Sequence, residues 1–406
     1  MSQLPRAHGR LRLVARAALG FAAGLLVSCG GGVDSGGTGA PALAFASGTI
    51  TGFGSVIVNG VHFDDRSAAV RDGDGNARSR DDLRLGMTTD VRGSAVGVDA
   101  AGNPASTASS IVFASEIVGP VSASDTAARS LVVLGQTIDV TTGTVFDTSL
   151  AGGQAALAVG NVVEIYARLD AAAGHYVATR IERRGSVAQY ALRGIVSGLN
   201  KPALTFSIGA TRIAYASLPA AAVPATLADG RFMRVSLALS PGAGGVWNAT
   251  RIVDGAAAIV DGEQAHIEGR VSAFTSVAQF SVNGTPVDAG TAQFPNGSAG
   301  LALGRRVEVE GTLAAGVLVA RSVKLESDGG GGSGGGEEYE VSGNIASLDT
   351  AANTFVVRNV VVSYAGTVDF RGGTAADLAV GREVEARGML SADGTRLQAT
   401  RIDIRH

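Results

Sequence analysis

Residues 301–323, LALGRRVEVEGTLAAGVLVARSV, decide the fold of this chain because they combine three signals in a short space. A Leu-x-x-Gly step comes first, the run VEVEG at 307–311 follows, and an Ala-x-x-Val pair closes the stretch. Apolar and charged side chains alternate along the run with a period of two, which is typical of a strand with one face on a core. The stretch therefore predicts a strand that follows a glycine turn, and a second strand that returns beside it.

The same signals recur five times along the chain, which is the pattern of a tandem repeat. Start marks of the form Gly-x-(Ile/Val) begin at Gly48, Gly119, Gly194, Gly269 and Gly343. The Leu-x-x-Gly steps are Leu83/Gly86, Leu157/Gly160, Leu227/Gly230, Leu301/Gly304 and Leu378/Gly381. The closing pairs are Ala108/Ile111, Ala178/Ile181, Ala249/Ile252, Ala320/Val323 and Ala399/Ile402. Because all three marks keep one order in every copy, chance spacing of glycines does not explain them.

Each copy predicts about five strands, in the order long strand, hairpin, connector, hairpin. Runs such as Phe280-Ser281-Val282 alternate as strands do, and Asn59-Gly60 and Asn283-Gly284 are dipeptides that favour tight hairpin turns. We therefore expect an all-β chain of five tandem small antiparallel β-barrels with an OB-like fold, because closure removes exposed sheet edges. An open two-layer sandwich is the alternative.

The marks also divide the chain into segments. We expect a signal peptide (1–28), a lipid-anchored spacer (29–45), five β-barrel repeats (46–115, 116–189, 190–262, 263–326 and 338–406) and a Gly/Ser linker (327–337) before the last repeat. Because a Gly/Ser tract behaves as a flexible coil, the order of segments predicts a linear array with the fifth barrel on a tether.

The N-terminus has the layout of a secretory signal peptide. Four arginines and no acidic residue precede an apolar run, 17–27, which is shorter than the roughly 20 residues that span a bilayer. The run leads into Leu26-Val27-Ser28-Cys29, which resembles the lipobox of bacterial lipoproteins. The resemblance implies cleavage before Cys29 and acylation of that residue, so that the chain is anchored in the cell envelope. Gly30, in place of aspartate, implies the outer membrane of a Gram-negative bacterium; an ordinary secretory signal is the alternative.

Composition narrows the classes of partner and of stabilisation. The net charge is −3, and removal of the arginine-bearing signal segment leaves a more acidic chain with no basic cluster. Because phosphate contacts supply most of the affinity for nucleic acids, we expect no nucleic-acid partner. The single cysteine cannot pair within the chain, and aromatic residues make up only 5% of the sequence. The cores are therefore expected to consist of aliphatic side chains.

The repeat itself resembles a known family. The pattern Leu-x-x-Gly-x-x-Val-Glu-Val-x-Gly, a turn, and Ala-x-x-Ile is similar to the domain-of-unknown-function family numbered 5666, which occurs in tandem in proteobacterial lipoproteins. The opening SGTITGFGSVIVNGV at 47–61 is especially typical, whereas the third copy departs from the pattern because Phe232-Met233-Arg234-Val235 lacks the glutamate. The resemblance implies a small β-barrel and no assigned activity.

Residues that often carry chemistry do not converge in this sequence. His62, His175 and His266 occupy different positions of different copies, and no pair has metal-ligand spacing. Asp72-Gly73-Asp74-Gly75-Asn76 opens like a calcium loop but lacks the later glutamate. The pairs Glu308/Glu310 and Glu383/Glu385 have the period-two spacing of a solvated strand face. We therefore expect no catalytic residue, metal or cofactor.

The best candidate for a ligand surface is aromatic. Tyr166, Tyr176 and Trp247 fall in the second and third copies of a chain that is otherwise poor in aromatics, and Tyr166 and Tyr176 flank one predicted hairpin. OB-type barrels bind oligomers across one sheet face, and aromatic side chains serve there as stacking platforms. A glycan or peptide groove is therefore one hypothesis, and core or inter-barrel packing of these residues is the other.

Taken together, these features predict a non-enzymatic lipoprotein of the cell envelope that acts as a multi-domain scaffold or binding array. The alternative is a polysaccharide- or peptide-binding module in envelope or biofilm assembly, with an envelope glycan or protein as partner. An enzyme is a third hypothesis, which the absence of an extra polar cluster in any copy disfavours.

Replacement of Cys29 by serine is expected to release the protein from membranes, because the acylated sulfur is lost. Membrane and soluble fractions of cells that express either form, probed by immunoblotting, measure this directly. If the wild-type protein and the Cys29→Ser variant both fractionate as soluble protein, the lipoprotein interpretation fails.

Overall fold

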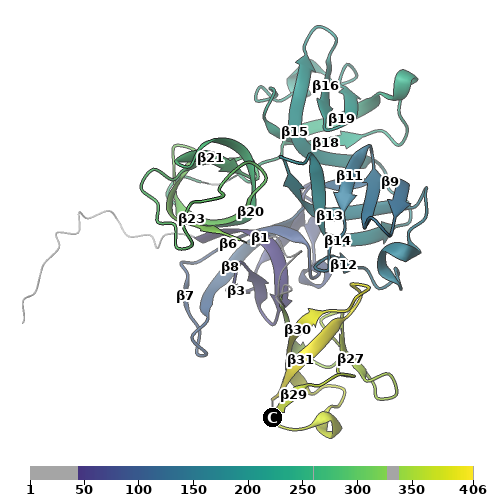
Figure 1. Cartoon of the computed structure of the whole chain (residues 1–406), viewed down its shortest axis with the longest axis vertical. Helices are drawn as coiled ribbons and strands as arrows, with labels where there is room; N and C mark the ends of the chain where they lie inside the picture. Colours follow the sequence, from purple (N-terminus) through teal and green to yellow (C-terminus); the bar gives the residue numbers. More distant parts are fainter. Residues whose placement is uncertain (1–43, 259, 327–337, 406) are drawn as a thin grey trace, which may run out of the picture. The chain divides into compact units, whose positions relative to one another are not determined.

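The computed structural model describes residues 44–258, 260–326 and 338–405. These residues form β-strands and five short 3-10 turns, and none of them is in an α-helix. Figure 1 shows the strands grouped into small rings along the chain.

The strands fall into five consecutive groups, which we call barrels 1 to 5. Barrel 1 contains β1 (Ala44–Phe53), β2 (Val56–Val58), β3 (Val61–Asp64), β4 (Ala69–Asp72), β5 (Ala77–Arg78), η1 (Arg80–Asp82), β6 (Thr88–Gly93), β7 (Gly97–Val98) and β8 (Pro104–Phe113). Barrel 2 contains β9 (Ile117–Asp125), β10 (Ser130–Val133), β11 (Gln136–Asp139), β12 (Val145–Phe146), η2 (Gly153–Ala156), β13 (Val162–Asp170) and β14 (His175–Arg184). Barrel 3 contains β15 (Tyr190–Asn200), β16 (Thr205–Ile208), β17 (Thr211–Ala214), η3 (Ala220–Ala222), β18 (Phe232–Leu237), η4 (Ala243–Gly245) and β19 (Trp247–Asp254).

The last two groups follow the same plan. Barrel 4 contains β20 (Gln264–Ser276), β21 (Gln279–Val282), β22 (Thr285–Asp288), β23 (Arg306–Ala314) and β24 (Val317–Leu325). Barrel 5 contains β25 (Tyr339–Asn344), β26 (Ser347–Asp349), β27 (Thr354–Val357), β28 (Val360–Ser363), β29 (Asp369–Arg371), η5 (Ala375–Asp377), β30 (Glu383–Leu390) and β31 (Leu397–Ile404). β1 begins two residues before the predicted start of the first repeat. The boundaries of the repeats as units of the chain remain a prediction.

Barrel 4 shows how each ring closes. β20 pairs with β21, β21 with β22, β22 with β24, β24 with β23, and β23 returns to β20 (Figure 1). Only the β22–β24 pair is parallel, because the chain crosses one end of the barrel between the third and fourth strands. The alternating sequence pattern does not reveal this parallel pair.

The same order of five paired strands closes the other rings, as their pairings show. In barrel 5 the first strand is split into β25 and β26. The all-β class and the small closed five-stranded barrel are therefore confirmed, and the open sandwich is not observed. Such a ring leaves no long unpaired edge.

A pair of backbone hydrogen bonds joins the Gly-x-(Ile/Val) start mark to the Leu-x-x-Gly step. In barrel 4 the Val271 amide donates to the carbonyl of Arg305 at 2.9 Å, and the Gly304 amide donates back to the Val271 carbonyl at 2.9 Å. Gly304 has φ +78°, a left-handed conformation that glycine adopts without steric cost. The equivalent glycine amides donate to equivalent carbonyls in every barrel: Gly86 to Ile50, Gly160 to Val121, Gly230 to Val196 and Gly381 to Ile345.

The leucine of the Leu-x-x-Gly step fills the end of its barrel. Leu83, Leu157, Leu227, Leu301 and Leu378 are all buried, and each ends a turn in which its amide donates to the carbonyl three residues earlier. The connector between the third and fourth strands is therefore tied to the core by one apolar side chain in each copy.

A β-bulge explains why the two buried residues of the closing Ala-x-x-(Ile/Val) pair lie three positions apart. In a regular strand, residues three apart face opposite sides. Ala320 and Val323 are both buried, because the β23–β24 register shifts by one residue between Glu310 and Gly311. The fourth and fifth strands of the other barrels show the same shift beside the closing alanine.

The start glycine is required by close packing of the first hairpin turn. A Cβ on Gly269 would lie 2.2 Å from the Asn283 side chain, whose Nδ2 donates to the Glu268 carbonyl. Gly48 has the same relation to Asn59. Both asparagines and the glycines that follow them have positive φ, as the predicted hairpin turns require.

The barrels are joined through their first strands and do not form a linear array. β1 runs parallel to β20, from Ala44 opposite Gln264 to Ser47 opposite Ile267, and its other end pairs with β25 at Gly52 and Phe53. β9 and β15 pair as well, so barrels 2 and 3 share backbone hydrogen bonds. The predicted linear order is wrong because barrels distant in sequence pair with barrel 1 directly.

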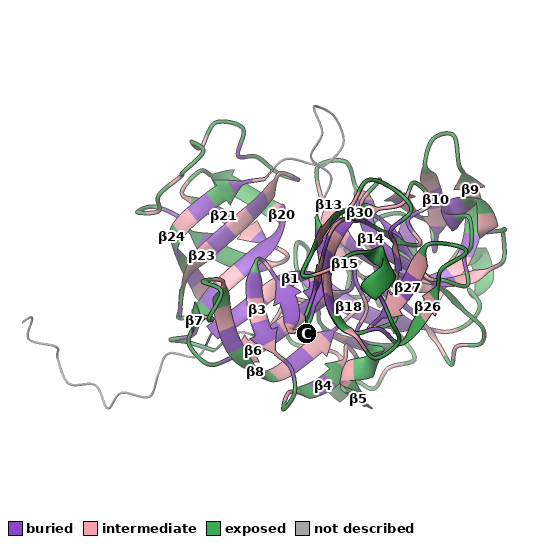
Figure 2. Cartoon of the chain, turned by 90° about the horizontal axis from the view of Figure 1, so that it is seen from below, coloured by how far each residue is buried: buried purple, intermediate pink, exposed green. Residues whose placement is uncertain are grey.

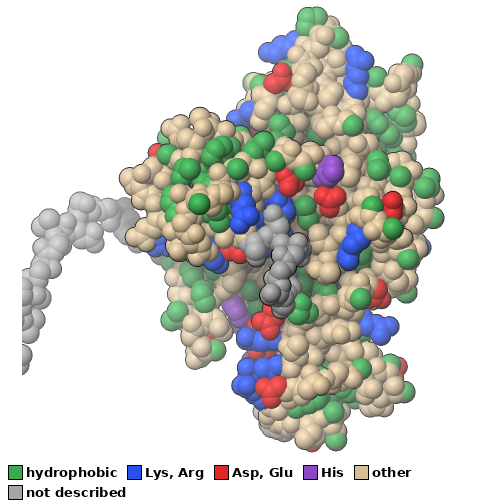
Figure 3. All heavy atoms as spheres, viewed as in Figure 1, with side chains coloured by type: hydrophobic (Ala, Val, Ile, Leu, Met, Phe, Trp, Pro, Cys, Tyr) green, Lys and Arg blue, Asp and Glu red, His purple; other side chains and the backbone are tan. Residues whose placement is uncertain are grey.

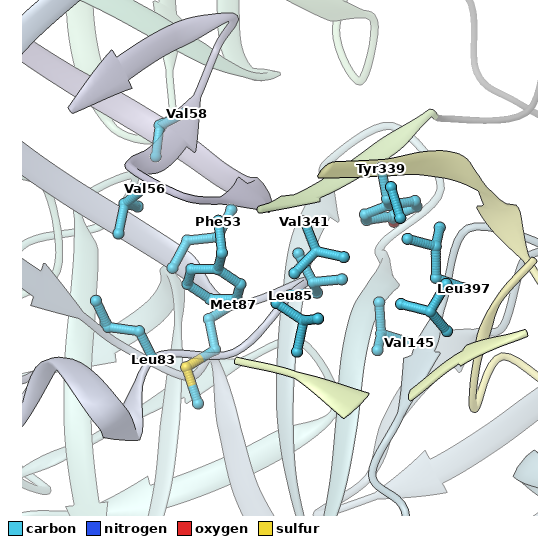
Figure 4. Packing of buried hydrophobic residues seen from close by; sticks show 14 of the residues in the cluster. Phe53, Val56, Val58, Leu83, Leu85, Met87, Val145, Tyr339, Val341 and Leu397 are labelled. Carbon is cyan, nitrogen blue, oxygen red and sulfur yellow. The ribbon is translucent and has the colours of Figure 1, made fainter. Parts of the chain in front are cut away.

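The hydrophobic cores also cross barrel boundaries. Buried residues alternate with exposed ones along strands such as β23 and β24 (Figure 2). One cluster is shared by barrels 1 and 5 and includes Val145 and Tyr166 of barrel 2, a second is shared by barrels 2 and 3, and a third combines barrel 4 with Phe45 of β1. Figure 4 shows side chains of the first cluster from three barrels: Leu85, Met87, Val145, Tyr339, Val341 and Leu397.

Substitution of a turn glycine is expected to lower stability even where the side chain has space. Gly160 has φ +88° and no atom within 4 Å of an added Cβ. Gly160→Ala should lower the free energy of unfolding by about 1 kcal/mol, because alanine is strained in the left-handed region. Gly185→Ala, at an equally open site without positive φ, is the control and should change it by less than about 0.5 kcal/mol. Equal effects of the two substitutions in urea unfolding would refute the role assigned to this turn.

Candidate functional site

The two tyrosines predicted to share a ligand surface are buried in different cores. Tyr166 on β13 and Tyr176 on β14 are each 1% exposed. Tyr166 belongs to the cluster of barrels 1 and 5, whereas Tyr176 belongs to that of barrels 2 and 3. They do not lie opposite each other, because Tyr166 pairs with Arg180 and Tyr176 with Leu169. The prediction of a shared exposed face is wrong for these two residues, which fill barrel and inter-barrel cores.

Trp247 takes part in local packing of barrel 3. Its ring contacts Tyr190 edge-on, with 5.8 Å between centroids and 72° between planes. The half-buried indole also packs against the core of barrels 2 and 3. Trp247 thus connects the first and fifth strands of its barrel through a side-chain contact.

Cys29, the predicted lipidation site, lies outside the described residues, and the anchor stays a prediction. Among residues 44–258, 260–326 and 338–405, no helix is long and apolar enough to cross a membrane. The same residues contain no group of three or more His, Cys, Asp or Glu side chains placed to hold a metal. In the calcium-like loop the Asp72 carboxylate instead accepts hydrogen bonds from the backbone of Asp74 and Asn76 and from Arg78.

The paired glutamates on the fourth strands form ion pairs with arginines on the same strand, on the neighbouring strand or just after it. Glu310 binds Arg321 at 2.6 Å, and both are exposed. Glu385 binds Arg387 at 2.9 Å and Arg405 at 2.6 Å. These ladders are the outer faces of their barrels, and Figure 3 shows Lys, Arg, Asp and Glu side chains gathered over β30 and β31. The period-two spacing therefore places these glutamates in ion pairs on the outer face of the strand.

A buried polar network joins barrels 1, 2 and 4. The Arg168 guanidinium, on β13, lies 3.1 Å from the Glu268 carboxylate on β20 and donates to the Thr49 hydroxyl on β1 at 2.7 Å. Glu268 also binds Arg306 at 2.5 Å. Burial opposes ionisation of Glu268, but the two arginines outweigh it and hold the pKa of this carboxyl below its usual value.

A second buried pair joins barrels 2 and 3. Arg193, on β15, donates to the Glu116 carboxylate at 2.9 Å and to the Gly255 carbonyl at 2.7 Å. Glu116 also accepts from the Ala167 amide at 2.9 Å. Burial raises the pKa of Glu116 in spite of Arg193 nearby. Only about 50 Å³ of space remains among these groups, so the junction is filled by its own side chains.

Reasoning from the sequence missed this network, although a signal for it is present. Arg193, Glu268 and Arg270 stand directly beside the start glycines, in the parts of the first strands where buried residues are concentrated. Charged residues at such positions indicate burial with a partner, since isolated buried charges are strongly unfavourable. The sequence does not show which barrel supplies that partner.

A cleft of about 980 Å³ lies between barrels 1 and 5. We call it the charged cleft, and its ionisable lining residues are His62, Asp64, Arg66, Asp99, Glu340, Arg371, Glu383, Glu385, Arg387, Arg401, Asp403 and Arg405. Barrel 1 contributes β3, the β1–β2 turn and the arm 94–103 between β6 and β8. In OB-folds the second and third strands and the corresponding loops form the ligand-binding face.

Most charges in the charged cleft are paired with each other. Arg66 binds Asp64 at 2.5 Å, and Arg401 binds Asp403 at 2.7 Å. His62 is half-buried, and its pKa is lowered mainly by burial and also by Arg387, against the opposing effect of Asp99. No Phe, Tyr or Trp lines the cleft. Such a surface offers many hydrogen-bond donors and acceptors with little net charge, which suits a polar ligand.

Three regions of the chain are similar to a known protein family. The family model described as Domain of unknown function (DUF5666) matches residues 118–182, 268–324 and 342–403. These regions lie in barrels 2, 4 and 5, whereas barrel 1 carries the additional arm and barrel 3 lacks the glutamate of the fourth strand. No curated protein matches the chain. The three matches confirm the predicted resemblance to this family and are consistent with tandem repeats of its domain.

Proposed function

We propose that the protein is a non-enzymatic scaffold of the cell envelope, anchored through acylated Cys29, in which interlocked barrels hold binding surfaces in fixed relation. The observation that carries this proposal is the pairing of the single strand β1 with β20 of barrel 4 and β25 of barrel 5. Barrels connected only by linkers would lack such backbone pairing and would move independently.

Buried ion pairs support the same proposal. An arginine–carboxylate pair is satisfied only in one geometry, and loss of one partner leaves an uncompensated buried charge. Arg168 and Glu268, with side chains 10% and 9% exposed, connect barrels 2 and 4 in this way. Arg358 of barrel 5 binds Asp65 of barrel 1 at 3.0 Å and lies over the ring of Phe53. These contacts fix the relative positions of barrels that are distant in sequence.

Arg168→Met tests whether the barrels behave as one body. It should lower the free energy of unfolding by about 3 kcal/mol, because Glu268 loses one of its two cations in a buried site. Hydrogen exchange of the intact chain should become faster in β1, β13 and β20 together. Arg321→Met, which removes a solvent-exposed pair on barrel 4, is the control and should cost less than about 1 kcal/mol. If hydrogen exchange becomes faster only in β13, the barrels unfold independently of each other and the scaffold proposal is wrong.

A second candidate function, binding of an envelope polysaccharide or peptide, is favoured by the position of the charged cleft. The cleft lies on the face of barrel 1 that OB-folds use for oligosaccharides and oligonucleotides. Its paired charges of both signs favour a hydrogen-bonding polymer of low net charge over a polyanion.

Calorimetric titration of the intact protein with envelope polysaccharides and peptides tests this candidate. Ala101→Trp, on the arm that borders the charged cleft, should reduce the affinity at least tenfold by filling the opening. Ala100→Trp places the same bulk on the neighbouring exposed residue, which does not line the cleft, and should leave the affinity unchanged. Absence of binding to any of these polymers, or equal effects of the two variants, counts against a ligand in the charged cleft.

A further inference from the structure

A second large opening differs from the charged cleft in chemistry and in position. It is a groove of about 780 Å³ between barrels 1 and 4, beside the parallel pairing of β1 and β20. We call it the apolar groove. Because backbone hydrogen bonds hold its two walls together, the groove is already formed without a ligand.

The floor and part of the walls of the apolar groove are hydrophobic. Phe45, Val61 and Phe63 line it and are at most 4% exposed. Val96, on the arm of barrel 1, and Val319, on β24 of barrel 4, line it as well, yet they are 44% and 42% exposed. Two barrels therefore present large apolar side chains to the same opening, and a ligand between them would cover both.

One wall of the groove is polar but carries paired charges. His266 Nε2 shares a hydrogen bond with Glu308 Oε1, and Lys324 binds the other carboxylate oxygen at 3.3 Å. Burial opposes ionisation of Glu308, but His266 and Lys324 lower the pKa of this carboxyl to about 2. Glu310 is paired with Arg321. Because these charged groups are paired with each other, the wall can form hydrogen bonds with a ligand that carries no charge of its own.

The size of the apolar groove indicates whether its ligand is a small molecule or a protein. Pockets for small ligands typically have volumes of roughly 300–1,000 Å³, an apolar lining and a few polar groups. A stable protein–protein interface needs about 800 Å² from each partner. The apolar groove is a slot between two barrels, in which only Val96 and Val319 are large, exposed hydrophobic residues. It therefore fits a slender molecule better than a protein surface.

We infer that the apolar groove is a binding site for a neutral, predominantly aliphatic small molecule, whose chain lies between Val96 and Val319 and whose polar end reaches His266 and Glu308. The site is separate from the charged cleft, and the inference does not depend on the scaffold proposal.

The test uses the full chain with the Cys29→Ser substitution, so that attached acyl chains do not bind the probe. The probe is N-phenyl-1-naphthylamine, a neutral dye whose fluorescence rises in apolar surroundings. We expect saturable binding of one dye per chain, displaced by 1-dodecanol at lower concentration than by dodecanoate or dodecyltrimethylammonium, because the groove carries no unpaired charge. Preferential displacement by either charged amphiphile would overturn the assignment of a neutral ligand.

Paired variants locate the dye. Val96→Asn and Val319→Asn should each weaken dye binding about fivefold to tenfold, since each removes an apolar wall contact. Val98→Asn, two residues along the same arm and 76% exposed, does not line the groove and should leave binding unchanged. Thermal unfolding of each variant checks that the fold is intact. Non-saturable binding, or equal affinity of the Val96→Asn, Val319→Asn and Val98→Asn variants, would refute the proposed site.

Discussion

In every barrel, the amide of an isoleucine or valine on the first strand donates to the carbonyl of the residue after the turn glycine, and the glycine amide donates back. These two bonds attach the connector to the first strand at the point where the fourth strand must begin. The remaining features depend on that attachment. The buried leucine three residues before the glycine closes the barrel end, and the fourth strand leaves the turn already beside the first. Because backbone groups make the bonds, the side chains around them can vary among copies as long as the glycine is kept.

A closed barrel satisfies its own backbone, so association of barrels requires surfaces that the repeat does not supply. In this protein the first strands pair along one edge within their own ring and, along the other edge, with the first strand of another barrel. Charged residues next to the start glycines then become buried and find partners in other barrels, as Arg193 and Glu268 do. The openings are by-products of this arrangement. Two barrels packed against barrel 1 leave a charged cleft on one side of its arm and an apolar groove on the other.

Most of the barrel fold could be predicted from the sequence, because local physics determines it. The turn glycines, the Asn-Gly hairpins and the period-two strands all act within one copy of about 70 residues. The parallel pair of the third and fifth strands was not predicted, since alternation of side chains is the same in parallel and antiparallel strands of this kind. The sites were harder to predict. Tyr166 looked like a surface residue because its partners, in barrels 1 and 5, are remote in sequence. The clefts belong to pairs of barrels and leave no mark in any single repeat.

The extension of β1 also restricts how such a protein can change its number of repeats. Phe45 is buried in the core of barrel 4, and Phe53 packs in the cluster shared with barrel 5. A chain that lost either barrel through recombination would present one of these rings to water, and a chain that gained a copy would have no free segment of β1 to receive it. The Asn59 side chain donates to the backbone carbonyl of His266, 207 residues away, so this bond between barrels 1 and 4 needs Asn59 but no particular side chain at position 266. Copies of the repeat are thus free to diverge in sequence, but the length of the array is inherited as a unit with its first strand.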